Sequence, residues 1–332
     1  MRQFELESVE KVDQAVASQR DQRRDAFVAG GTTLLDLVKL DVMTPERMVD
    51  VTHLPLKRIE KLDDGRLKVG ALVTNNELAH HELVKRDYAV LSEALLAGAS
   101  TGLRNLATTA GNVMQRTRCP YYRDPAMPCN RREPGSGCAA LDGINRNHAV
   151  LGTSNRCIAT HPSDMCVGMV AVGATIVVEG PQGSREIPFE DYHLLPGDTP
   201  EKEHDLKDGE LITHVILDAP RAGGQHYLKL RDRASYEFAL ASCAAIVELD
   251  GDSVASARLA LGGVATKPWR AEAAEKALIG QPATRENFER AAEVALADAV
   301  AYSHNGYKIT LGKQAIVRAL RDATARTTAT AA

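Results

Sequence analysis

The sequence predicts an α+β protein with more than one domain, because three blocks of the chain differ in their order of strands and helices. The first block alternates short strands with helices, the second contains hairpins and a long helix, and the third alternates like antiparallel strands before it ends in helices. The chain has 332 residues, of which 44% are hydrophobic, so it is long enough to bury two or three cores.

Residues 1–56 form the first predicted unit, which is α/β in character. Apolar and alternating runs predict its strands, and helices are expected between them. The strands are expected over residues 4–9, 26–31 and 48–52, and the helices near 10–20 and over 33–40.

Residues 57–219 form the second predicted unit. Asp63-Asp64-Gly65 lies between two alternating segments and marks the turn of a hairpin. The other expected elements are a helix over residues 75–99, a helix that begins near 162–164, a hairpin over 174–189 and a strand over 208–219.

Residues 223–332 form the third predicted unit. PRAGGQ at residues 220–225 is a plausible linker before it. Antiparallel strands are expected over residues 226–271, followed by two or three helices.

Composition excludes several function classes. The net charge is −4, and the only dense basic patch is a cysteine-rich segment, so no binding to nucleic acid is expected. No membrane span appears in the sequence. The start, MRQFELESVEKVDQAV, has neither a basic nor an apolar signal region, so the chain is expected to carry no signal peptide of its own.

Four cysteines lie in an irregular segment that is rich in Pro, Gly and Arg, which points to a metal cluster. Prolines within this segment exclude a continuous helix or a central strand. Thiolate bonds to one inorganic core would supply the missing crosslinks. The candidate ligands are Cys119, Cys129, Cys138 and Cys157.

The spacing of these cysteines favours an iron-sulfur cluster over zinc. The gaps are nine, eight and eighteen residues, without the close pair typical of zinc modules. A thiolate-bound iron-sulfur cluster keeps negative charge, which neighbouring arginines would offset. Free cysteines with a solvated basic face remain an alternative, and disulfides are a less favoured one. Cys166 and Cys243 lie in apolar segments and are expected to be buried core thiols. The arginines are Arg116, Arg118, Arg123, Arg131 and Arg132.

Two further motifs suit close contact between main chain and a cofactor. At residues 29–33, Ala-Gly-Gly-Thr-Thr connects an apolar strand to an amphipathic helix, so main-chain N–H groups could face a phosphate. The motif lacks G-x-G-x-x-G spacing, and a simple tight turn is the alternative. ATTAGNVMQ at 107–115 combines small hydroxyl residues with Gly and Asn, and a polar turn is its alternative.

Taken in order, these motifs resemble the FAD-binding subunit of molybdenum hydroxylases, the xanthine dehydrogenase superfamily. The resemblance rests on AGGTTLLDLVK, TTAGN, the cysteine-rich insertion, HPSD and YLKLRDRASYEFA. QRTRCPYYRD, PCNRREPGSGCAAL and ATHPSD resemble, more narrowly, the flavin and 4Fe-4S subunit of bacterial periplasmic aldehyde oxidoreductase. The resemblance implies a two-part FAD-binding domain of p-cresol methylhydroxylase type, with a 4Fe-4S insertion at about 113–160. It also implies an α+β C-terminal domain like that of carbon monoxide dehydrogenase flavoproteins.

The resemblance also implies roles for individual residues. The glycine turn would wrap the FAD pyrophosphate, the second motif would line the same cofactor, and three residues elsewhere would contact FAD or its isoalloxazine ring. Without the resemblance, Asp164 is a helix-start residue, Ile212 a core residue and Lys229 a solvated strand residue. The implied FAD residues are Ala29, Gly30, Gly31, Thr32, Thr33, Leu34, Thr108, Gly111, Asn112, Asp164, Ile212 and Lys229. Cys119, Cys129, Cys138 and Cys157 would hold the 4Fe-4S cluster.

The function that follows from the resemblance is electron transfer within a heteromeric aldehyde oxidoreductase. A large molybdopterin-binding subunit and a small 2Fe-2S subunit would be the partners, and an external acceptor would take the electrons. No residue of this chain is expected to be catalytic, because no triad or paired-carboxylate motif appears. The chain would be cytoplasmic, or periplasmic by co-export with a signal-bearing partner. One alternative is a self-sufficient FAD-dependent oxidase of related fold, in which a metal bound by the cysteine-rich loop has only a structural role. The other is an interaction module without redox function, which a bound metal would stabilise.

Overall fold

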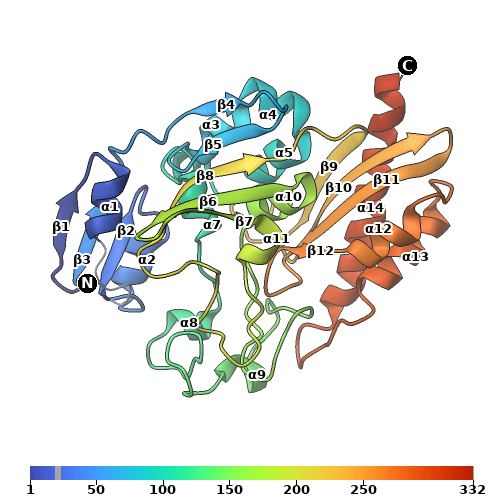
Figure 1. The fold of residues 1–332 in the computed structure, drawn as a ribbon. Helices are drawn as coiled ribbons and strands as arrows, with labels where there is room; N and C mark the ends of the chain where they lie inside the picture. The colour runs from blue at the N-terminus through green and yellow to red at the C-terminus, as the bar shows by residue number, and fades with distance from the viewer. Residues whose placement is uncertain (19–23, 332) are drawn as a thin grey trace.

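The computed structural model describes residues 1–18 and 24–331, and this part of the chain contains three β-sheets. Figure 1 shows the sheets in chain order from left to right, with the N-terminus at the left and the C-terminal helix at the right. Each sheet falls within one of the three blocks expected from the sequence, and the division of these blocks into domains stays a prediction.

The N-terminal sheet is parallel and has the order β1-β3-β2. Helices connect its strands, as parallel pairing requires. Residues 19–20 of the helix expected near 10–20 lie outside the described residues. The elements are β1 (Glu5–Ser8), α1 (Val12–Ser18), β2 (Asp25–Val28), α2 (Leu34–Lys39) and β3 (Arg47–Asp50).

The central sheet is antiparallel and has the order β4-β5-β8-β6-β7. Both expected hairpins are confirmed, and Gly65 (φ 87°) and Gly183 (φ 98°) turn the chain where a side chain would be strained. The elements are β4 (Ile59–Lys61), β5 (Leu67–Gly70), β6 (Ala174–Gly180), β7 (Gly183–Pro188), α11 (Phe189–Tyr192) and β8 (Leu211–Leu217).

One continuous helix over residues 75–99 is a wrong prediction, because this segment forms three short helices. His81 has extended backbone (φ −63°, ψ 133°) and separates the first two. Tyr88 is buried and donates its hydroxyl proton to the carbonyl of Asp218 (2.7 Å), and there the backbone leaves helical geometry. The elements here are α3 (Asn75–His80), α4 (Glu82–Asp87), α5 (Ala89–Ala97), α6 (Thr101–Arg104) and α7 (Thr109–Val113).

The C-terminal sheet is antiparallel, has the order β12-β11-β10-β9 and is covered by helices on both faces. Alternate residues of β10 show this: Cys243 and Ala245 join the core formed with α12–α14, whereas Ala244 and Ile246 join the core that contains α5 and α10. The elements are β9 (Gly224–Leu230), β10 (Ala241–Asp250), β11 (Ser253–Gly262), β12 (Trp269–Arg270), α12 (Glu272–Leu278), α13 (Arg285–Ala295) and α14 (Tyr307–Ala331).

Helix α10 (Asp164–Val172) joins the central and C-terminal parts. Every residue of this helix is buried, and it contacts α5 as well as β10 and β11. Ser163 caps it by accepting a hydrogen bond from the N–H of Cys166 (3.1 Å). The helix start expected near residues 162–164 is therefore confirmed.

The cysteine segment, residues 113–160, projects below the three sheets in Figure 1. Its helices are the single turns α8 (Pro120–Arg123) and α9 (Ala139–Asp142), in agreement with its proline content. Within residues 1–18 and 24–331, no helix combines the length and apolar character needed to span a bilayer.

Candidate functional site

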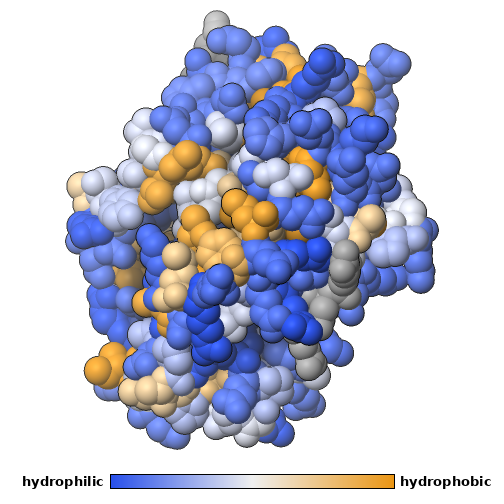
Figure 2. Space-filling model, turned by 90° about the vertical axis from the view of Figure 1, so that its left-hand side faces the viewer, coloured by the Kyte–Doolittle hydropathy of each residue, from blue (hydrophilic) through white to orange (hydrophobic). Residues whose placement is uncertain are grey.

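A cleft of about 690 Å³ is lined by the N-terminal part, by α7 and by β8 with the segment before it. Its size suits a cofactor or another small molecule. Figure 2 turns the N-terminal side toward the viewer, and apolar surface gathers near the middle of this face. Nine of the twelve predicted FAD residues line the cleft: Ala29, Gly30, Gly31, Thr32, Thr33, Leu34, Thr108, Gly111 and Ile212.

The glycine turn has a shape that only glycine permits. A Cβ atom on Gly30 would lie 1.8 Å from the carbonyl oxygen of Leu106, and Gly31 has φ 68°. Beside this contact, the Thr108 side chain accepts a hydrogen bond from the N–H of Gly111 (3.2 Å) and caps α7. The glycine turn therefore packs closely against the chain segment that leads into α7.

The three other predicted FAD residues are not among those that line the cleft. Asn112 accepts a hydrogen bond from the Ser163 hydroxyl (2.6 Å). Lys229 Nζ lies 2.8 Å from Asp164 Oδ2, and the Tyr227 hydroxyl donates to Asp164 Oδ1 (2.6 Å). The side chains of Asp164 and Lys229 are 9% and 4% exposed, so Lys229 is not a solvated strand residue.

Buried imidazoles also line the cleft, and no sequence pattern predicted their role there. His161 Nε2, His193 Nδ1 and His204 Nδ1 are buried without a hydrogen-bond partner. Burial lowers the pKa of all three rings, to about 3 for His193, so they are neutral near pH 7.

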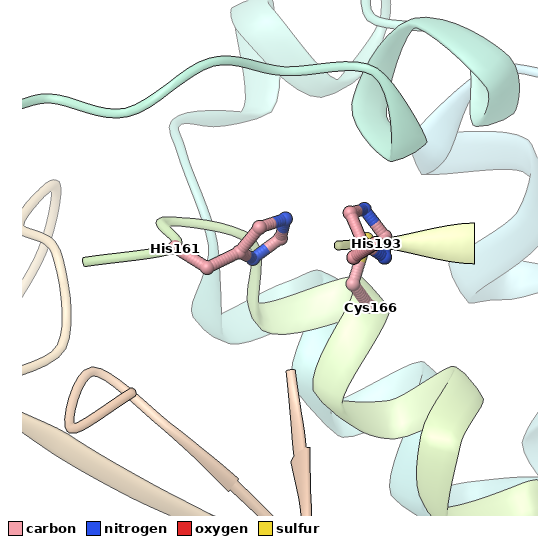
Figure 3. Close-up of side chains that lie close together, drawn as sticks. All are labelled: His161, Cys166 and His193. Atoms are coloured by element: carbon pink, nitrogen blue, oxygen red, sulfur yellow. The ribbon is translucent and has the colours of Figure 1, made fainter. Parts of the chain in front are cut away.

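His161, Cys166 and His193 meet beside the cleft, with donor atoms within 4.8 Å of one another (Figure 3). Their hydrogen bonds oppose metal binding. His161 Nδ1 accepts from the N–H of Ser163 (3.3 Å), so the proton of the neutral ring is on Nε2. His193 Nε2 donates to the carbonyl of Val113 (3.1 Å), which leaves a lone pair on Nδ1. Burial raises the pKa of Cys166 to about 12. A divalent metal would have to displace protons from both the His161 ring and the thiol.

The four cysteines of the cysteine segment line one small pocket, as the sequence predicts for a common centre. All six cysteines lie in the described residues, and each is free of a disulfide. Cys129 and Cys138 pair through an isolated β-bridge, and Cys166 and Cys243 are buried in the core, as expected.

Several N–H groups point at the cysteine sulfurs. Burial raises the pKa of Cys119 to about 12, while main-chain N–H groups of Tyr121 and Tyr122 act in the opposite direction. The N–H of Ala159 donates to Cys157 Sγ (3.4 Å), and His148 Nε2 lies 3.1 Å from Cys119 Sγ. This donor set favours sulfur that carries negative charge, as in metal-bound thiolates.

The arginines of the cysteine segment also hold the segment in place through ion pairs and hydrogen bonds, beside providing positive charge near the sulfurs. Arg118 and Arg123 both pair with Asp36 on α2, at 3.0 and 2.7 Å. Arg132 donates to main-chain carbonyls, including that of Tyr122 (2.7 Å). The contact of α2 with the cysteine segment was not predicted, because sequence spacing contains no information about such distant pairs.

A wider surface hollow of about 1040 Å³ lies between α1 and the central sheet and involves Lys68 and His214. Among the described residues that line it, none has a buried polar atom without a partner. The cleft with the glycine turn is therefore the better candidate for a cofactor.

Residues 2–220 match the family model described as the FAD binding domain in molybdopterin dehydrogenase, and residues 226–323 match the CO dehydrogenase flavoprotein C-terminal domain. The chain is 49% identical to the aldehyde oxidoreductase FAD-binding subunit PaoB of Escherichia coli, over 98% of this chain and 100% of PaoB. The chain belongs to the family of FAD-binding subunits of molybdenum hydroxylases. It is thus the flavoprotein subunit of an oxidoreductase.

More distant family members share the fold over their whole length. The carbon monoxide dehydrogenase medium chain of Hydrogenophaga pseudoflava is 27% identical, over 97% of this chain and 98% of its own. A chain of the solved carbon monoxide dehydrogenase structure from this organism superposes with a TM-score of 0.77 at 28% identity and covers 98% of this chain and 99% of its own. The predicted α+β fold class, with an FAD-binding part and a C-terminal domain of the carbon monoxide dehydrogenase type, is confirmed.

The buried pair of Asp164 and Lys229 yields a stability prediction. Lys229→Met should lower the free energy of unfolding by about 3–5 kcal/mol, because it leaves a buried carboxylate without its cation. Adding Asp164→Asn to this variant should recover part of the loss, which urea denaturation would measure. Arg285→Met, which breaks the exposed pair with Glu289, is the control and should change little. If the double variant lost as much free energy of unfolding as the two single variants together, Asp164 and Lys229 would not be coupled.

Proposed function

We propose that this chain is the electron-transfer subunit of a molybdenum-containing aldehyde oxidoreductase. In this proposal it holds FAD and a 4Fe-4S cluster and passes electrons from molybdenum and 2Fe-2S centres on partner subunits to an external acceptor. The observation that carries the proposal is the position of the cysteine pocket directly beside the cleft, with Arg131 lining both. The 49% identity to a subunit named for aldehyde oxidoreductase supports aldehydes as substrates of the complex.

The residues of the cleft fit FAD. Gly30 and Gly31 line the cleft in a tight turn before α2, where main-chain groups could bind a pyrophosphate, and the buried Ile212 adds apolar character to the wall for a ring system. His161 and His193 line the cleft with neutral rings, and each has one buried nitrogen without a hydrogen-bond partner. Contacts of FAD with Asn112, Asp164 and Lys229 stay predictions from the family resemblance. FAD supplies electron-accepting chemistry, and the chain supplies its position and surroundings.

The residues of the cysteine pocket fit a 4Fe-4S cluster. Four free cysteines face one pocket, and main-chain N–H groups and Arg131 approach their sulfurs. Hydrogen bonds and positive charge of this kind stabilise thiolates and tune iron-sulfur potentials. The cysteine spacing supports iron-sulfur over zinc.

A large molybdopterin-binding subunit and a small 2Fe-2S subunit are the proposed partners. Names of relatives such as "medium chain" and "FAD-binding subunit" support a place within a larger assembly. The assembly would be cytoplasmic, or periplasmic if a partner carries the export signal.

Flavin content tests the cleft. Gly31→Val should purify with little of its flavin, because a β-branched residue is strained at φ 68° and its Cβ would lie 2.7 Å from Leu35 Cδ1. Flavin absorbance per polypeptide measures the loss. Gly102→Ala is the matched control, since no atom lies within 4 Å of a Cβ there. Full flavin occupancy in a folded Gly31→Val protein would place FAD elsewhere.

Iron and sulfide content tests the cluster. Cys129→Ser should lose most of both, because it removes one of four thiolates, whereas Cys243→Ser in the core should keep both. The wild-type spectrum should combine flavin absorbance with a broad iron-sulfur absorbance that bleaches on reduction. Flavin alone, or bound zinc, would favour a self-sufficient oxidase with a structural metal loop.

Reconstitution tests the place of the chain in a complex. The purified chain alone should not oxidise aldehydes with any acceptor, because the proposal assigns the molybdenum and 2Fe-2S centres to partners. Co-expression with a large molybdopterin-binding subunit and a small 2Fe-2S subunit should yield a stable complex that does. Aldehyde turnover by the single chain would contradict the proposal.

A further inference from the structure

Arg131 stands in the wall that separates the cysteine pocket from the cleft. Its side chain is 8% exposed, and it lines both cavities. Its Nη2 atom lies 3.8 Å from Cys157 Sγ, in donating geometry. On the other side, Nη1 lies 2.8 Å from Glu203 Oε2. One buried guanidinium therefore contacts a cysteine of the pocket and a carboxylate of the cleft.

Glu203 fixes this guanidinium within a buried ion triad. A second cation, Arg116, donates from Nε to Glu203 Oε1 (2.7 Å), so each carboxylate oxygen has its own arginine. Burial alone would raise the pKa of Glu203, but the two arginines lower it to about 2. Arg131 carries its positive charge because a guanidinium does not lose its proton in proteins. All three groups are charged near neutral pH.

The triad carries one net positive charge, because two guanidinium groups face one carboxylate. Ion triads that serve only folding are costly to bury, since desolvation offsets much of their attraction. The neighbouring imidazole of His204 does not add charge, because burial lowers its pKa. The net positive charge of the triad therefore lies in the wall between the cysteine pocket and the cleft, where water screens it little.

We propose that Arg131, held in place by Glu203, supplies a fixed positive charge that raises the reduction potential of the centre bound by the four cysteines. This inference rests on the proposed 4Fe-4S cluster. Reduction adds one electron, and so one negative charge, to that centre, and a nearby fixed cation stabilises the reduced form. Arg131 touches a cysteine ligand, whereas Glu203 acts through Arg131 and is a positioning residue.

A potentiometric titration of the purified chain, followed by the electron paramagnetic resonance signal of the reduced cluster, tests the inference. Arg131→Gln keeps hydrogen-bonding atoms but removes the charge. It should lower the ratio of reduced to oxidised cluster at a given potential at least tenfold, which is about 59 mV for a one-electron couple. Arg146→Gln is the matched control, because Arg146 also lies in the cysteine segment but is exposed, pairs with Asp232 and does not line the pocket, so the potential of this variant should equal that of the wild type.

Two further variants separate charge from structure. Glu203→Gln raises the net charge of the triad, so it should shift the potential upward, opposite to Arg131→Gln. Arg131→Lys keeps the positive charge, so the reduction potential of this variant should stay close to that of the wild type. The inference is overturned if Arg131→Gln and Glu203→Gln shift the reduction potential in the same direction. If the Arg131→Gln protein holds no cluster, a lower reduction potential in Glu203→Gln alone overturns it. Wild-type protein without iron and sulfide would instead overturn the proposed function.

Discussion

Helix α10 is buried on every side, and its burial determines how the two larger sheets are joined. This helix has no solvent-facing side, so α5, α7 and the C-terminal sheet must close around it together. A buried carboxylate at its first residue, Asp164, then requires a cation, and β9 provides it in Lys229. The N-terminal two thirds and the C-terminal part of the chain are therefore joined by a core that neither could complete alone.

Two carboxylates attach the cysteine segment to the rest of the FAD-binding part. Asp36 on α2 and Glu203 before β8 each contact two arginines of the segment. The segment has almost no regular structure. These pairs and the arginine bonds to carbonyls therefore support the small hydrophobic cluster that the segment shares with α2, formed by Leu37, Tyr122 and Cys129. The arginines thus combine two tasks, since they anchor an irregular loop and provide positive charge near four thiols.

Local sequence patterns predicted those turns and helix ends that depend only on residues close together in the chain. Hairpins at Gly65 and Gly183, the start of α10 and the glycine turn all follow from turn chemistry or capping, and the structure shows them where the sequence indicates. The break at Tyr88 could not be predicted, because a contact with Asp218 across the fold imposes it. Glu203 was missed for the same reason: nothing in its sequence surroundings indicates that two distant arginines will bury it.

The attachment of Arg118 and Arg123 to Asp36 has a consequence for how the protein matures. Asp36 lies on the short helix that follows the glycine turn, so this turn and the cysteine segment share one anchor. Ordering either segment lowers the conformational entropy that the other must still lose, and such coupling is reciprocal. The glycine turn and the cysteine segment are then expected to become ordered cooperatively, so a ligand that fixed one of them would also favour order in the other.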